Sequence, residues 1–118
     1  MVVKVGTYGV RKTILIGQES YYIALPCVVT GTVNGVIKAG EPLAGDITKR
    51  NTAFTAATEG AVGISLHEVK LDANGRGNAT LVLAACVDLL KLDEATRGKV
   101  NTAKADLNRI IFVEGSAI

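Results

Sequence analysis

The stretch that decides the fold is residues 61–90, which read AVGISLHEV, KLDANGRGN and ATLVLAACVDLL in succession. Two apolar runs, 61–69 and 79–90, flank a polar loop that contains Asn74-Gly75. Asn-Gly between two β-prone runs is a strong short-range signal for a β-hairpin, because both residues readily adopt the positive φ angles of a tight turn. The sequence therefore predicts a hairpin over this stretch.

The two arms of the predicted hairpin differ in how their apolar residues are spaced. In the first arm, Val62, Ile64 and Leu66 alternate with small or polar residues, so one face of this strand belongs to a core. In the second arm, 79–90, both faces are apolar. Such a strand is buried on both sides, either between two layers of its own domain or against another subunit.

Residues 20–37, upstream of the hairpin, favour extended structure. Pro26 has no amide donor, so we expect the first strand to end there or to lie at an edge. Asn34-Gly35 lies between valines and predicts a second hairpin.

Residues 46–60 form a long connection of weak periodicity, either a binding element or a segment partly ordered by a neighbour. Within it, Phe54 is expected to anchor in the core.

One helix is expected, near the C-terminus. Asp93 is a suitable N-cap, and Glu94 follows in the first turn, where a carboxylate is favourable. From Val100 onward, apolar residues recur at spacings of three and four, which indicates one buried helical stripe. The run 110–113 is β-prone and should pair or pack. The predicted fold class is mainly β with one C-terminal helix (α+β), arranged as a small β-sandwich or barrel.

Composition limits the choice of partners. The 118 residues suffice for one domain with a real core. With 13 basic and 11 acidic residues, the net charge of +2 does not indicate a nucleic-acid partner, and no apolar run is long enough for a membrane span. The apolar fraction of 48% and the mean hydropathy of +0.32 exceed what a small monomer readily buries. These values favour a homo-oligomer.

Candidates for catalysis or metal binding are few. His67 is the sole histidine and lies next to Glu68, but nothing in the sequence places it in a cleft with an orienting partner, so a position on the surface or at an interface is expected. Cys27 and Cys86 both lie inside apolar runs, which favours buried, reduced thiols over a disulfide or a metal site. We expect no cofactor and no enzymatic activity.

Residues 1–20 differ in character from residues 21–118. They are basic and contain no acidic residue before Glu19. Two interpretations stand side by side: an arm that orders on a partner surface, or a loosely attached terminus. The N-terminal sequence lacks the features of a secretion signal, so we expect assembly in a reducing cytoplasm. The chain is thus divided into an arm, 1–20, and a β-rich domain, 21–118.

The order of these motifs resembles that of the head decoration and head fibre proteins of tailed bacteriophages, over about residues 33–113. In that family a strand of the form Ala-Val-Gly-Ile/Val-Leu-Leu-x-Asp/Glu-Val precedes a turn and a Val-Leu-Val-x-Gly-x-Val strand. A closing helix then leads to a short Gly-Ile-x-Phe strand. Here residues 61–69 fit the first strand, Ala85 stands where the family often has glycine, and residues 108–112 fit the closing strand.

The resemblance implies a non-enzymatic homotrimer that cements the outer surface of the expanded phage head, with the major capsid protein as its partner and the virion as its location. Its arm would bind the shell by strand addition. The residues expected at the shell are Val2, Val3, Lys4, Arg11, Lys12, Ile14, Leu15 and Ile16. The residues expected between copies are Leu81, Leu83, Ala85, Val87 and Ile118.

Two other functions remain open on the sequence alone. One is a different virion component, such as a tail or fibre-base module. The other is an enzyme or a small-ligand β-barrel. That last class requires polar side chains that converge on a pocket, and the sequence offers no such cluster.

Overall fold

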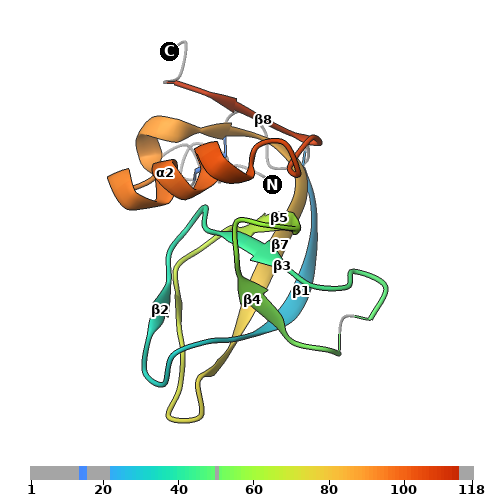
Figure 1. Cartoon of the computed structure of the whole chain (residues 1–118), viewed down its shortest axis with the longest axis vertical. Helices are drawn as coiled ribbons and strands as arrows, with labels where there is room; N and C mark the ends of the chain where they lie inside the picture. Colours follow the sequence, from blue (N-terminus) through green and yellow to red (C-terminus); the bar gives the residue numbers. More distant parts are fainter. Residues whose placement is uncertain (1–13, 16–21, 50, 115–118) are drawn as a thin grey trace, which may run out of the picture.

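A computed structural model describes residues 14–15, 22–49 and 51–114 (Figure 1). The elements follow one another as β1 (Ile23–Thr30), β2 (Val36–Ile37), β3 (Pro42–Ala44), β4 (Phe54–Ala56), β5 (Ala61–Ser65), β6 (Val69–Lys70), β7 (Arg76–Asp88), the short 3-10 helix η2 (Leu89–Lys91), α2 (Glu94–Ala103) and β8 (Ile110–Val113). The predicted class, mainly β with one α-helix near the C-terminus, is confirmed for the described residues.

The larger sheet closes into a small barrel. Its strands lie in the order β1-β4-β3-β5-β7-β8, and β1 also pairs with β7. The antiparallel ladder between β1 and β7 runs from the pair Ile23–Ala84 to the pair Thr30–Arg76, so it joins the first strand of the order to the fifth. β8 lies outside this closure and forms the upper end of the molecule in Figure 1.

Strands β5 and β7 form the predicted hairpin, with Ile64 opposite Val82. The turn lies at residues 72–75, where Gly75 has a φ of 73° and donates its N–H to the carbonyl oxygen of Asp72 at 2.9 Å. Between the two arms, β6 pairs with β2 instead of β7. This pairing produces the two-stranded extension at the lower left of Figure 1.

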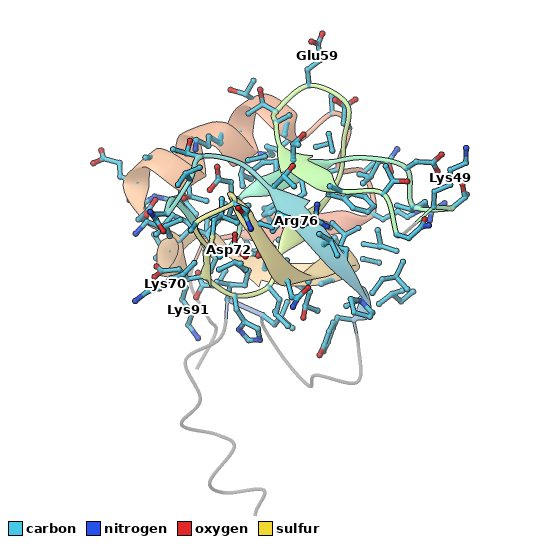
Figure 2. The ribbon with its side chains drawn as sticks, turned by 90° about the horizontal axis from the view of Figure 1, so that it is seen from below. Lys49, Glu59, Lys70, Asp72, Arg76 and Lys91 are labelled. Carbon is cyan, nitrogen blue, oxygen red and sulfur yellow. The ribbon has the colours of Figure 1, made fainter. Side chains whose placement is uncertain are left out.

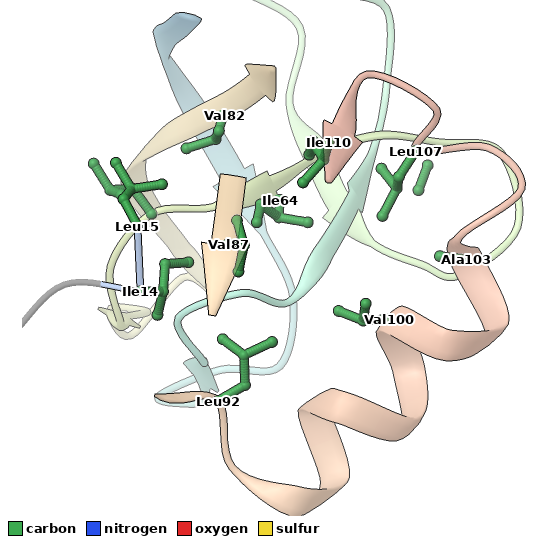
Figure 3. Close-up of a cluster of buried hydrophobic side chains, with 12 residues drawn as sticks. Ile14, Leu15, Ile64, Val82, Val87, Leu92, Val100, Ala103, Leu107 and Ile110 are labelled. Carbon is green, nitrogen blue, oxygen red and sulfur yellow. The ribbon is translucent and has the colours of Figure 1, made fainter. Parts of the chain in front are cut away.

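Strand β7 lies between two hydrophobic cores. The barrel core includes Leu43, Phe54 and Leu81, each with no exposed surface. The helix-side core lies among β7, β8 and α2 and includes Val82 and Val87 (Figure 3). Leu81 and Val82, which point to opposite faces of this strand, are thus both buried within a single chain, whereas residues 83–86 are half-buried. This is the first of the two alternatives that the sequence left open.

Three local expectations change in the structure. β1 continues through Pro26, which lies opposite Thr80 of β7, so the strand does not end at this proline. Asn34, with a φ of 56°, lies in a tight turn in which the Gly35 N–H donates to the Thr32 carbonyl oxygen at 2.8 Å, and the next strand pairs with β6 rather than back onto β1. The connection 46–60 contains β4, which inserts between β1 and β3.

Helix α2 begins where the sequence predicts. The Asp93 carboxylate accepts the Thr96 backbone N–H at 2.8 Å. Hydrogen bonds from Thr96 lower the pKa of Asp93, and the bond from its side chain has a larger effect than the bond from its backbone. Val100 and Ala103 are fully buried in the helix-side core. The helix ends at Ala103, so Leu107 joins this core from a turn rather than from the predicted longer stripe.

Replacing Phe54 tests how far the barrel depends on one side chain. Phe54→Ala is expected to lower the free energy of unfolding by about 3–5 kcal/mol, because the ring has no exposed surface and its removal leaves a cavity. Ile47→Ala, at a side chain 38% exposed, should change it by less than about 1 kcal/mol. Urea denaturation followed by circular dichroism measures both; equal losses would contradict a barrel centred on Phe54.

Candidate assembly surface

An apolar patch lies on the outward side of the sheet. Ile23 on β1 and Ile111 on β8 have 61% and 64% of their surface exposed. Ile23 lies opposite Ala84, and Ile111 lies opposite Cys86. Ala84 and Cys86 are two residues apart on β7 and therefore share a face. We call these four residues, Ile23, Ala84, Cys86 and Ile111, the outer face.

A β-bulge determines which residues of β7 face outward. The register between β1 and β7 shifts at Ile23 and Ala24, which leaves Leu83 without an opposite residue. Val82, before the bulge, and Ala85, after it, therefore both pack on the helix-side core although they are three residues apart. The alternation read from the sequence is interrupted at this point.

The residues predicted to lie between copies do not share a surface. Leu81 packs in the barrel core and Val87 in the helix-side core, and neither has any exposed surface. Leu83 and Ala85 are half-buried. Ile118 lies outside the described residues. The outer face cannot be recognised from the sequence, because its position depends on the bulge and on the pairing of β8.

Two of the residues predicted to bind the shell are described, and both belong to the fold. Ile14 and Leu15 are 4% and 6% exposed and pack in the helix-side core. The Asp88 N–H donates to the Ile14 carbonyl oxygen at 2.8 Å, and Leu15 pairs antiparallel with Val87. They fasten this segment to β7 and have little surface left for a partner. The others lie outside the described residues: Val2, Val3, Lys4, Arg11, Lys12 and Ile16.

A cleft of about 640 Å³ opens beside β2 and β4, and Glu41 is the charged residue in its lining. One carboxylate oxygen of Glu41 accepts from the Lys99 ammonium at 2.8 Å, and the other accepts the Lys38 N–H at 3.0 Å. Both oxygens are therefore engaged in holding the turn before β3 against helix α2. The geometry gives Glu41 a structural role.

Charged side chains are spread over several loops and strands rather than gathered (Figure 2). The Asp72 carboxylate accepts the backbone N–H groups of Arg76 at 3.0 Å and of Asn74 at 2.8 Å. These hydrogen bonds lower the pKa of Asp72, and the bond from Arg76 has the larger effect. This carboxylate therefore shapes the hairpin turn. His67 is exposed, as expected. In the described part of the chain, no group of three His, Cys, Asp or Glu side chains is placed to hold a metal ion.

No protein-family model and no curated protein matches this chain. None of the helices in the described ranges is both long and apolar enough to cross a membrane.

The two cysteines should differ in reactivity. Both are free thiols; Cys27 is buried and burial raises its pKa, whereas Cys86 is half-buried on the outer face. Because the thiolate is the reactive form, iodoacetamide should label Cys86 at least about tenfold faster than Cys27 in the folded protein. Timed labelling followed by peptide mass spectrometry measures the two rates. Equal rates in the folded chain would contradict the burial of Cys27.

The contacts of Glu41 predict unequal effects at the two ends of its ion pair. Glu41→Ala should lower the free energy of unfolding by about 1–3 kcal/mol, because it leaves the Lys38 N–H without its acceptor as well as removing the pair. Lys99→Ala should cost less than about 1 kcal/mol, because the Lys99 side chain is 47% exposed. Thermal unfolding compares the variants, and a larger effect at Lys99 would contradict this assignment.

Proposed function

We propose that this chain is a non-enzymatic structural protein that binds the outer surface of an expanded phage head as a homotrimer and cements it. The observation that carries the proposal is the order of elements: β5 with the motif of residues 61–69, the turn, β7, helix α2 and the short strand β8. The head decoration proteins that the sequence resembles have the same order. Fold alone does not define function, so the placement of the chain segments also matters.

The position of Ile14 and Leu15 supports an arm that starts at the domain. These residues fix the chain beside β7, and the 13 residues before them span up to about 43 Å when extended. The longest dimension of the molecule is 40 Å. If extended, a segment of this length would project beyond the domain, far enough to contact a neighbouring protein. Its valines suit strand addition to a shell protein, and its cations suit an acidic surface.

The proposed mechanism is a binding equilibrium. A protein that binds only the assembled, expanded lattice stabilises that state by mass action. A homotrimer presents three arms, so after the first contact the other two bind at a high effective concentration. Individually weak contacts then hold the shell together, and the mechanism requires no catalytic group.

Neutralising the cations of the arm tests the proposal. The variant Lys4→Gln, Arg11→Gln, Lys12→Gln should bind expanded heads that lack decoration at least about tenfold more weakly than the wild type, because it loses the charge attraction to the shell. A matched control removes three exposed lysines of the domain: Lys49→Gln, Lys70→Gln, Lys91→Gln. Co-sedimentation with heads gives the affinities, and static light scattering gives the mass of the free protein.

The control should bind like the wild type, and the free wild-type protein should have the mass of a trimer. A monomeric wild-type protein that does not sediment with the heads would contradict the proposal. An equal loss of binding in both triple variants would exclude a specific role for the arm.

A further inference from the structure

Strand β8 has an open edge within the described residues. Val87 on β7 pairs with Phe112 of β8 and also with Leu15 of the N-terminal segment. Two partners of one strand residue lie on opposite sides of that strand, so β8 and the N-terminal segment flank β7. No described strand pairs with the far edge of β8, which forms the upper edge of the sheet in Figure 1.

The hydrogen bonds of β7 identify the backbone groups at that edge. The Asp88 N–H donates to the Ile14 carbonyl oxygen, so the backbone groups of Asp88 point away from β8 and those of Val87 point toward it. In the parallel register of Val87 with Phe112, Val87 bonds to the two residues that flank Phe112. The N–H and C=O of Phe112 therefore point to the open edge.

The residues of this strand form a self-complementary pattern. Arg109 precedes β8 and Glu114 follows it; both are exposed, and the four residues between them carry no charge. In an antiparallel pair centred on Phe112, Arg109 of one copy lies one position away from Glu114 of the other at each end. Their side chains leave the backbone on opposite faces, so the two charges attract across the end of the pair without facing each other. A parallel pair would bring like charges together. A partner strand must present a negative charge near Arg109 and a positive charge near Glu114. A second copy of β8, turned round by a two-fold axis, presents both charges in this order.

We propose that β8 pairs antiparallel with the β8 of a second copy of this chain, about a two-fold axis. In this arrangement the two Phe112 residues lie opposite each other, and the N–H of each donates to the carbonyl oxygen of the other. Ile111 lies beside the second copy's Val113, so the outer faces of the two copies join into one apolar surface. The paired edge is four residues long, which makes the association weak and dependent on concentration.

This contact goes beyond the proposed function and does not rest on it. Its symmetry is two-fold, so it is distinct from the three-fold contact of the proposed homotrimer. It converts a monomer to a dimer; a trimer has three such edges, so the same contact joins trimers into larger species. On a shell it would join neighbouring decoration proteins edge to edge.

Charge exchange on the full chain tests the pairing. In sedimentation-velocity runs at increasing protein concentration, the mass of the wild type should rise, to that of a dimer where the free protein is a monomer and to that of linked trimers where it is a trimer. R109E and E114R should each raise the dissociation constant of this step by about threefold or more at low ionic strength, because each places like charges at both ends of the pair. An equimolar mixture of R109E and E114R should associate about as tightly as the wild type, because opposite charges then meet again at both ends. K49E and E59R make the same changes of charge in exposed loops outside β8.

Each outcome decides the proposal. Association that weakens in both single variants, recovers in their mixture and persists in K49E and E59R supports it. A wild-type mass that is constant with concentration overturns it, as does single-variant association as tight as the wild type's. A mixture that fails to recover shows that the charges act outside an antiparallel pair and also overturns it. Circular dichroism of each variant verifies that the exposed substitutions leave the fold intact.

Discussion

The double burial of β7 is the constraint on which the rest of the structure depends. Leu81 faces the barrel core, and its neighbour Val82 faces the helix-side core, so both sides of this strand must be covered. The barrel covers one side through its pairing of β7 with β1 and β5. Helix α2 and β8 cover the other. A barrel alone would leave Val82 and Val87 in water, which explains why the chain continues into a helix and a further strand.

The bulge at Leu83 lets one strand serve both cores. Without an extra residue, strict alternation would place Ala85 and Val87 on the side of Leu81. The shift moves them to the helix-side core and turns Ala84 and Cys86 outward. Side-chain type gives no sign of this, because every residue from 81 to 87 is apolar. The bulge is set by the partner strand, so alternation along β7 predicts Leu81 and Val87 on one face although they belong to different cores.

Features with local physical causes were predictable from the sequence. Asp93 caps its helix through the nearby Thr96 N–H, and Gly75 supplies the positive φ of the hairpin turn; both causes lie within a few residues. The anchoring of Phe54 was also predictable, because a lone aromatic residue in a polar connection has one favourable place.

The short strands were not predictable. β2, β4 and β6 have two or three residues each, so their pairing is decided by distant partners rather than by their own composition. The Asn34-Gly35 turn formed as its residues require, yet the strand after it paired with β6.

The outer face was not predictable either, because it also depends on strand pairing. Its apolar residues are visible in the sequence, but only the register of three strands places Ile23, Cys86 and Ile111 on one face.

The last residues of β7 connect the two surfaces to which function is assigned. On one side, Asp88 and Val87 hold the chain at Ile14 and Leu15; on the other side, Val87 pairs with β8. In the proposed role, a load on the arm enters the domain at Ile14. Burying these two aliphatic side chains contributes about 3–6 kcal/mol to holding that point. The hold is strongest when the helix-side core is complete. In that role, the core that covers the buried face of β7 would also anchor the arm, and the load would pass into the sheet rather than into a loop because Ile14 and Leu15 are paired with β7.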